Sequence, residues 1–148
     1  MFTKKQKINK YCCLYVSDFH LEMILLPYLK KKINNSKILI FTQTNLTESI
    51  KILLDKTNFN IEDKEKILNI NCWNNVNKNE LYEEKGNEYT IVINGDIEYI
   101  MDINEKIKTI NSEVINVVDC YNINNINIKS QYINENYKGT LNTKSFNF

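Results

Sequence analysis

The residues best suited to chemistry follow two apolar runs of the chain. Asp18 and His20 come directly after the run Tyr11–Val16, and Asp96 follows a second run that ends at Ile93. Carboxylate and imidazole groups can hold metal ions or act as acid and base in hydrolysis. A two-metal centre needs several oxygen and nitrogen ligands, however, and His20 is the only histidine in the chain. The simpler interpretation is that Asp18 and Asp96 cap helices.

The same residues also have a familiar order. The segment Ser17–His20, followed later by Asn94–Asp96, looks like the opening of a calcineurin-like metallophosphoesterase. That resemblance implies a small hydrolase in which the side chains of Asp18, His20 and Asp96 converge on the substrate. We keep this hydrolase as an alternative, although the further histidines of such enzymes have no counterpart here.

The composition argues against several functional classes. The 148 residues include no arginine and only three glycines, and 19 lysines against 18 acidic residues give a net charge of +1. A phosphate-binding loop or a dinucleotide fingerprint cannot be written with Gly86, Gly95 and Gly139 alone. Without arginine, the bidentate fork that grips phosphate or guanine is missing. We therefore expect no cofactor, no nucleic-acid or membrane binding, and no enzymatic activity.

Cysteine usage points to an interior role for the thiols. Cys12, Cys13, Cys72 and Cys120 show neither C-x-x-C spacing nor a histidine cluster, which disfavours zinc and a disulfide framework. Free cysteine behaves as a small hydrophobic residue, so buried thiols are expected. Because successive residues of a strand point to opposite faces, Cys12 and Cys13 should enter different layers of the core.

Apolar runs alternate with amphipathic segments along most of the chain. Strands are predicted at 11–16, 37–41, 70–73, 89–93 and 114–118, and helices at 19–32, 45–54, 61–68 and 97–110. Residues 74–88 are polar and predict a surface loop. This alternation is typical of a three-layer α/β fold with a mostly parallel five-stranded sheet flanked by helices. The segment after Asn122 could add a sixth, edge strand or begin a helix.

Helix starts can be assigned from capping residues. Asp18 and Asp96 are the expected N-caps of the first and last of these helices, and Asn45 with Glu48 has the spacing of a capping box. Pro27 lies inside the first helix and should bend it. These caps place the polar residues that follow each strand at one edge of the sheet.

The chain length favours one domain. We expect a basic N-terminal arm at 1–10, a single α/β domain at 11–141 and a flexible tail at 142–148. The first apolar run, Tyr11–Val16, is too short for a signal-peptide core or a membrane span, so a cytoplasmic location is expected.

The candidate binding site follows from the topology. In open α/β sheets, ligands bind at the carboxyl ends of the strands. Those ends should carry a rim of neutral hydrogen-bonding groups, aromatic rings and a few carboxylates, a mixture better suited to holding a small organic ligand than to reacting with it. The predicted ligand-binding residues are Tyr15, Ser17, Asp18, His20, Gln43, Thr44, Trp73, Asn94, Asp96, Tyr99, Asp119 and Tyr121.

Five short motifs follow one another along the chain. Tyr11–Tyr15 precedes Pro27-Tyr28 in the first helix, and Gly95–Tyr99 precedes Glu105 and then Asp119–Asn122. In this order they resemble the MEDS domain (methanogen/methylotroph DcmR sensory domain), a bacterial and archaeal sensory module, over residues 11–141. Tyr11 stands where that family usually has histidine.

The resemblance implies a fold and a role. The fold would be RecA-like or Rossmann-like without a phosphate-binding loop. The role would be sensing of a small organic ligand on behalf of a histidine kinase or transcription regulator, reached by protein contact, and a homodimer is compatible with it. The alternative is a pure interaction adaptor with a degenerate ligand site, which would bind its partner through the aromatic residues Tyr132, Tyr137, Phe146 and Phe148.

Overall fold

Five parallel strands form a single sheet in the computed structural model, which describes residues 7–70, 73, 86–110, 112–124 and 130–142. The elements in chain order are β1 (Lys7–Tyr15), α1 (Asp18–Lys32), β2 (Lys37–Thr42), α2 (Thr47–Lys56), α3 (Ile61–Leu68), β3 (Gly86–Asn94), α4 (Ile97–Ile107), β4 (Ser112–Asn122), α5 (Ser130–Asn136) and β5 (Gly139–Leu141). The strand order is β2-β3-β4-β1-β5, and every pairing is parallel. The predicted α/β class is confirmed, and the order is consistent with a three-layer RecA-like or Rossmann-like fold.

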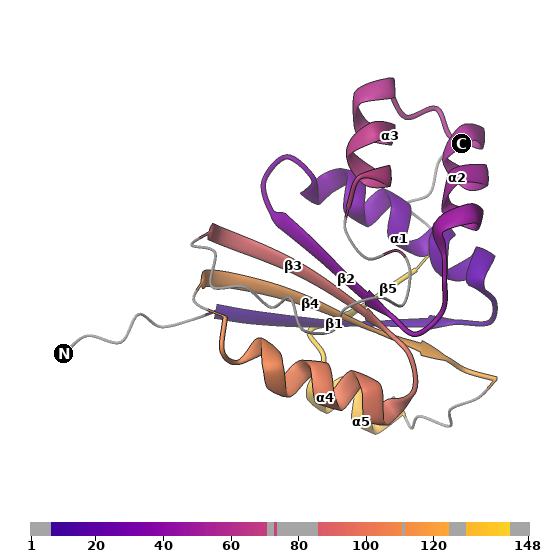
Figure 1. The fold of residues 1–148 in the computed structure, drawn as a ribbon. Helices are drawn as coiled ribbons and strands as arrows, with labels where there is room; N and C mark the ends of the chain where they lie inside the picture. Colours follow the sequence, from indigo (N-terminus) through magenta and orange to yellow (C-terminus); the bar gives the residue numbers. More distant parts are fainter. Residues whose placement is uncertain (1–6, 71–72, 74–85, 111, 125–129, 143–148) are drawn as a thin grey trace.

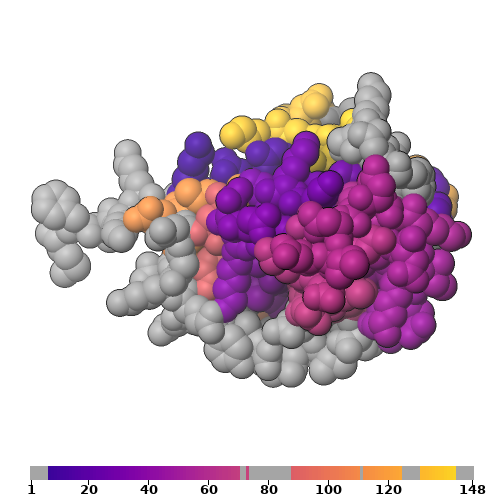
Figure 2. Space-filling view, turned by 90° about the horizontal axis from the view of Figure 1, so that it is seen from above, coloured from indigo at the N-terminus to yellow at the C-terminus, as the bar shows by residue number. Residues whose placement is uncertain are grey.

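Helices cover both faces of the sheet. Helices α1, α2 and α3 lie on one face, and α4 and α5 lie on the other (Figure 1). Seen from above, α2 and α3 form a large part of the surface on the first face (Figure 2). On the second face, Ile100, Ile103 and Ile107 recur at helical spacing on α4 and are buried against the sheet. Because both faces are covered, the strands can be apolar on both sides.

Alternation along the strands divides the core into two halves. Cys13 lies in the half under α1, and its neighbour Cys12 lies in the half under α4. Both thiols and that of Cys120 are free and buried, as predicted, while Cys72 lies outside the described residues. Burial raises the pKa of Cys12 to about 12, so this thiol stays protonated at neutral pH.

The predicted strand at 70–73 was wrong at both of its described ends. Ile70 and Trp73 lie in bends, and residues 71–72 lie outside the described residues. The backbone carbonyl of Trp73 accepts a hydrogen bond from the Leu46 N–H at 2.8 Å. The Trp73 indole N–H donates to the carbonyl of Ile67, also at 2.8 Å. Ile70 and Trp73 therefore contribute to the half of the core under α1, α2 and α3, and β5 supplies the fifth strand.

Several boundaries also differ from those predicted. Strand β1 starts at Lys7, so the last four residues of the expected basic arm are part of the sheet, and β3 starts at Gly86 instead of residue 89. Residues 1–6, 74–85 and 143–148 lie outside the described residues, so the rest of the arm, most of the expected loop and nearly all of the expected tail do too. The segment after Asn122 continues to Asn124 without strand structure.

The helix caps were predicted with mixed success. Asp96 caps α4, and its side chain accepts a hydrogen bond from the Tyr99 N–H at 2.8 Å, as expected. The N-cap of α1 is Ser17 instead of Asp18, which lies in the first turn. The N-cap position of α2 is Leu46 instead of the predicted Asn45. The Asn45 side chain still accepts a hydrogen bond from the N–H of Thr47, the first residue of α2. None of the helices among the described residues is long and apolar enough to cross a membrane.

Truncation of Ile103 should reveal how much α4 contributes to folding. Ile103 is completely buried in the half of the core under α4, so Ile103→Ala should lower the free energy of unfolding by about 2–5 kcal/mol. Met101 lies on the same helix with 62% of its surface exposed, and Met101→Ala should change that energy by about 0.5 kcal/mol or less. Urea unfolding followed by circular dichroism measures both. Equal losses would contradict the assigned inner face of α4.

Candidate functional site

The carboxyl ends of the strands meet at one edge of the sheet because all the strands are parallel. In the strand register, Thr42 of β2 pairs with Asn94 of β3, and Asn94 pairs with Cys120 of β4. Cys120 in turn pairs with Cys13 of β1. The polar residues that follow these positions therefore form a common rim, which we call the carboxyl edge.

A buried polar network joins three of the strand ends. The Tyr15 hydroxyl donates to the Asn94 side-chain oxygen at 2.5 Å, which connects β1 to β3 across β4. The Asn94 amide nitrogen donates to the hydroxyls of Thr42 at 3.0 Å and Thr44 at 3.3 Å. Burial raises the pKa of Tyr15, so its hydroxyl remains a donor at neutral pH. Asn94 is 1% exposed, while Thr44 is exposed, so the network reaches from the core to the rim.

A second group of contacts ties β2 to the start of α4. The Gln43 side-chain oxygen accepts from the Asp96 N–H at 2.7 Å. A side chain at Gly95 would collide with Gln43 and would approach the Tyr99 ring to 2.7 Å, so only glycine leaves room for this contact. Gln43 and Asp96 are exposed, whereas Tyr99, in the first turn of α4, is 7% exposed and packs into the core between α4 and the sheet. Gln43, Gly95 and Asp96 thus form the part of the carboxyl edge that follows β2 and β3.

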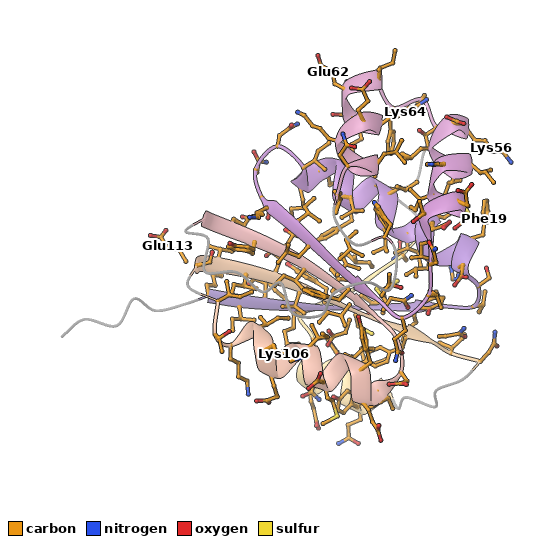
Figure 3. All side chains as sticks on the ribbon, in the orientation of Figure 1. Phe19, Lys56, Glu62, Lys64, Lys106 and Glu113 are labelled. Atoms are coloured by element: carbon orange, nitrogen blue, oxygen red, sulfur yellow. The ribbon has the colours of Figure 1, made fainter. Side chains whose placement is uncertain are left out.

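The segment after β1 makes mostly local contacts. Ser17 accepts from the His20 N–H at 3.1 Å, and the Nδ1 atom of His20 accepts from the Val16 N–H at 3.0 Å. The Nδ1 lone pair is therefore occupied, and the ring keeps its proton on Nε2 in the neutral form. The side chain of Phe19 points outward near this end of α1 (Figure 3) and is 48% exposed.

The hydrolase alternative required three side chains to converge. Asp18 follows β1 and Asp96 follows β3, and β4 separates these two strands by about 10 Å in all. His20 and Asp96 also start helices on opposite faces of the sheet. Their hydrogen bonds go to Val16 and Ser17 in the first case and to Gln43 and Tyr99 in the second. The structure does not bring the three residues into contact.

Two predicted site residues belong to a separate network under α4 and α5. Asp119 is 1% exposed, and its carboxylate accepts hydrogen bonds from the Asn104 amide at 3.0 Å and the Tyr137 hydroxyl at 2.7 Å. The Lys10 ammonium lies 3.3 Å from the same carboxylate. Since the Tyr137 proton goes to Asp119, the Tyr121 hydroxyl must donate to Tyr137 across their 2.5 Å contact. This network fastens α5 to the sheet.

The predicted site is therefore divided by the sheet. Tyr15, Trp73 and Asn94 lie on the α1 side, and Tyr99, Asp119 and Tyr121 lie on the α4 side. The remaining predicted residues lie along the carboxyl edge itself; they are Ser17, Asp18, His20, Gln43, Thr44 and Asp96. Trp73 and Tyr99 therefore lie in different halves of the core, and Tyr15 and Thr44 are the predicted residues that hydrogen-bond directly to Asn94.

Sequence reasoning missed several partners of these residues. Thr42 was not predicted, although its place at the last position of β2 puts it beside Asn94. Asn104 and Tyr137 were missed as partners of Asp119 because Asn104 lies on α4 and Tyr137 follows α5, so only the fold brings them to β4. Glu22 offered a clearer signal, since it is an acidic residue among the apolar positions of α1.

Glu22 is a fully buried carboxyl group between α1 and α2. The Ser49 hydroxyl donates to one of its oxygens, and the other oxygen has no hydrogen-bond partner among the described residues. Burial raises the pKa of Glu22 to about 7, with the negative charge of Asp18 acting in the same direction. Near neutral pH this group therefore exchanges between a neutral and a charged form inside the core.

Among the described residues, no group of three His, Cys, Asp or Glu side chains lies close enough to hold a metal ion. No protein-family model, curated protein or solved structure matches the chain.

Replacement of Glu22 should change how stability depends on pH. Because folding raises its pKa from 4.5 to about 7, the wild-type protein should be stabilised by the neutral form at low pH and should lose that contribution as the pH rises from 4.5 to 7. Glu22→Gln should lack this loss and should exceed wild type above pH 7 by an amount on the order of 3 kcal/mol. Urea unfolding on both sides of this range measures the difference.

The exposed Glu48 of α2 provides a matched control, because Glu48→Gln removes the same charge near the same helix pair without removing a buried group. Its pH profile should follow that of the wild type. Parallel profiles for wild type and Glu22→Gln would contradict the assignment of a raised pKa to Glu22.

Proposed function

We propose that this chain is a non-enzymatic sensory domain that binds a small organic ligand at the carboxyl edge. The ligand signal would pass by protein contact to a histidine kinase or a transcription regulator. The observation that carries the proposal is the network centred on Asn94, which links the ends of β1, β2 and β3 and opens to the surface at Thr44. A ligand that hydrogen-bonds to the rim would thereby act on three strand ends together.

The chemistry of this network favours recognition over reaction. Its groups are the hydroxyls of Tyr15, Thr42 and Thr44 and the amide of Asn94, all of which are neutral donors and acceptors. Neutral groups of this kind suit ligands that carry hydroxyl, amide or carbonyl functions. General acid or base catalysis would instead need a group that titrates near neutral pH within reach of the ligand.

The resemblance to the MEDS domain supports the same role. Its first two motifs are in contact in the structure, because the rings of Tyr11 and Tyr28 pack with centroids 6.4 Å apart. Its Gly-Asp motif, at Gly95 and Asp96, forms part of the carboxyl edge next to Gln43. The α/β class of the fold is also the one that the resemblance implies.

The two alternatives receive less support from the geometry. For the adaptor, Tyr137 is 8% exposed and is engaged with Asp119 and Tyr121, while Tyr132 is 48% exposed. Phe146 and Phe148, the other two aromatic residues of that hypothesis, lie outside the described residues. For the hydrolase, His20 and Asp96 make their hydrogen bonds at separate strand ends.

A ligand panel of small alcohols, amides and carbonyl compounds tests the proposal by thermal unfolding. A compound that binds only the folded state should raise the stability by about 2.7 kcal/mol at a hundredfold excess over its dissociation constant. Thr44→Val should weaken this stabilisation, because it removes the exposed hydroxyl at the mouth of the network. Thr140→Val removes an exposed hydroxyl from β5 and should leave it unchanged.

Two results would count against a ligand site at the carboxyl edge. One is the absence of stabilisation by every compound of the panel. The other is a stabilisation that is equally strong in wild type and in Thr44→Val, since the ligand would then bind elsewhere.

A further inference from the structure

Strand β1 is much longer than the strand at its outer edge. On one side, all nine of its residues pair with β4, from Lys7 opposite Val114 to Tyr15 opposite Asn122. On the other side, β5 pairs only with residues 11–13 of β1. The amino-terminal part of β1 therefore extends beyond β5, and no other strand of the described residues pairs with this edge.

The direction of the backbone groups can be assigned from two hydrogen bonds. The Lys10 carbonyl accepts from the Lys138 N–H, next to β5, at 2.6 Å. The Tyr15 carbonyl accepts from the Ile123 N–H, next to β4, at 2.9 Å. Because the N–H and C=O groups of successive strand residues point to alternate sides, Ile8 directs both of its groups to the same side as Lys10. That is the side on which β5 is absent.

A groove runs beside this edge. A pocket of about 420 Å³ is lined by Ile8, Asn9 and Lys10 of β1 and by residues 135–138 at the end of α5. Ile8 is 42% exposed and supplies an apolar patch next to the open backbone groups. The groove thus offers main-chain hydrogen bonds and an apolar contact, which are the two elements that strand addition requires.

Two exposed lysines stand at the groove: Lys138 belongs to its lining, and Lys7 precedes Ile8 on β1, next to the lining. The Lys138 ammonium reaches the Asn9 side chain at 3.4 Å. Glu135 is the acidic residue of the lining, whereas Lys10 is already paired with the buried Asp119. Two exposed ammonium groups against one carboxylate favour a negatively charged occupant.

We propose that this groove, which we call the β1 ledge, binds an extended acidic segment of another protein as an additional strand. The segment would alternate carboxylate and apolar side chains and would occupy the edge of β1 where β5 has not yet begun. Its backbone would pair with the N–H and C=O of Ile8, and its carboxylates would face Lys7 and Lys138. The β1 ledge lies at the end of β1 opposite to the carboxyl edge, so it is independent of the proposed ligand site.

A fluorescent heptapeptide of alternating glutamate and valine is a suitable probe, with binding followed by fluorescence anisotropy. The full chain should bind it with an affinity that falls as salt is raised, because the contact is partly electrostatic. The double variant Lys7→Glu/Lys138→Glu should bind at least about tenfold more weakly. The matched control is Lys56→Glu/Lys64→Glu, which changes two lysines on α2 and α3, away from the β1 ledge (Figure 3), and should bind as wild type does.

Two modified peptides separate the backbone contribution from the charge. The same heptapeptide with alternate backbone N-methylation, prepared in both registers, should not bind in the register that blocks pairing with Ile8. A heptapeptide with lysine in place of glutamate should also fail to bind. Equal binding of the methylated peptides would overturn strand addition, and equal binding of the lysine peptide would overturn the preference for an acidic segment.

Hydrogen exchange locates the contact. The N–H of Ile8 should become protected when the glutamate peptide is added, while the amides of α2 should not change. Sedimentation at several protein concentrations without peptide tests a second copy of the chain as the occupant. No binding of the glutamate peptide, or a dimer that the Lys7→Glu/Lys138→Glu variant abolishes, would overturn the proposal.

Discussion

The covering of both sheet faces by helices is the constraint on which the rest of this structure depends. A parallel sheet buried in this way has little access to water, so any polar side chain that its strands carry inward needs a partner inside the protein. Asn94 and Asp119 are the clearest cases, each 1% exposed and each hydrogen-bonded to several side chains. The two polar networks follow from this requirement, one on each face.

The two networks have different consequences because their charges differ. The network around Asn94 is neutral, so it can be extended by a ligand without leaving a charge unpaired. The network around Asp119 contains a buried carboxylate that Lys10 and two neutral donors satisfy, and removal of any partner would leave part of that charge uncompensated. The first is therefore the better candidate for binding, and the second is better explained as the attachment of α5.

The fold could be predicted from the sequence because the apolar runs of β1, β2, β3 and β4 are long and alternate with helical patterns. The fifth strand could not, since β5 has only three residues and its partner β1 lies more than a hundred residues earlier in the chain. Ile70 and Trp73 misled the prediction for a physical reason. An apolar run that packs into a core beside helices has the same composition as a short buried strand.

The sequence predicted which polar residues follow the strand ends, but not how they divide between the two faces of the sheet. Alternation along a strand predicts that Cys120 and Tyr121 point to opposite faces, as they do. Alternation does not reveal that the Tyr15 hydroxyl lies within reach of Asn94, because that distance depends on the strand order. With β4 between β1 and β3, only a side chain as long as tyrosine can bridge the two strands.

Strand β1 connects the two proposals, and the way it is held limits how they could influence each other. Tyr15 at its carboxyl end contacts the Asn94 network through a side chain, whereas Ile8 near its amino end would contact a partner through the backbone. Nine residues in register with β4 hold β1 as a rigid element, so a ligand at the carboxyl edge would shift it little. Helix α5 and strand β5, which border the β1 ledge, are attached through Tyr137 and a pairing of three residues. They should therefore be displaced more easily than β1. A partner at the β1 ledge would thus displace that C-terminal segment more readily than β1 itself, and the two sites would act independently.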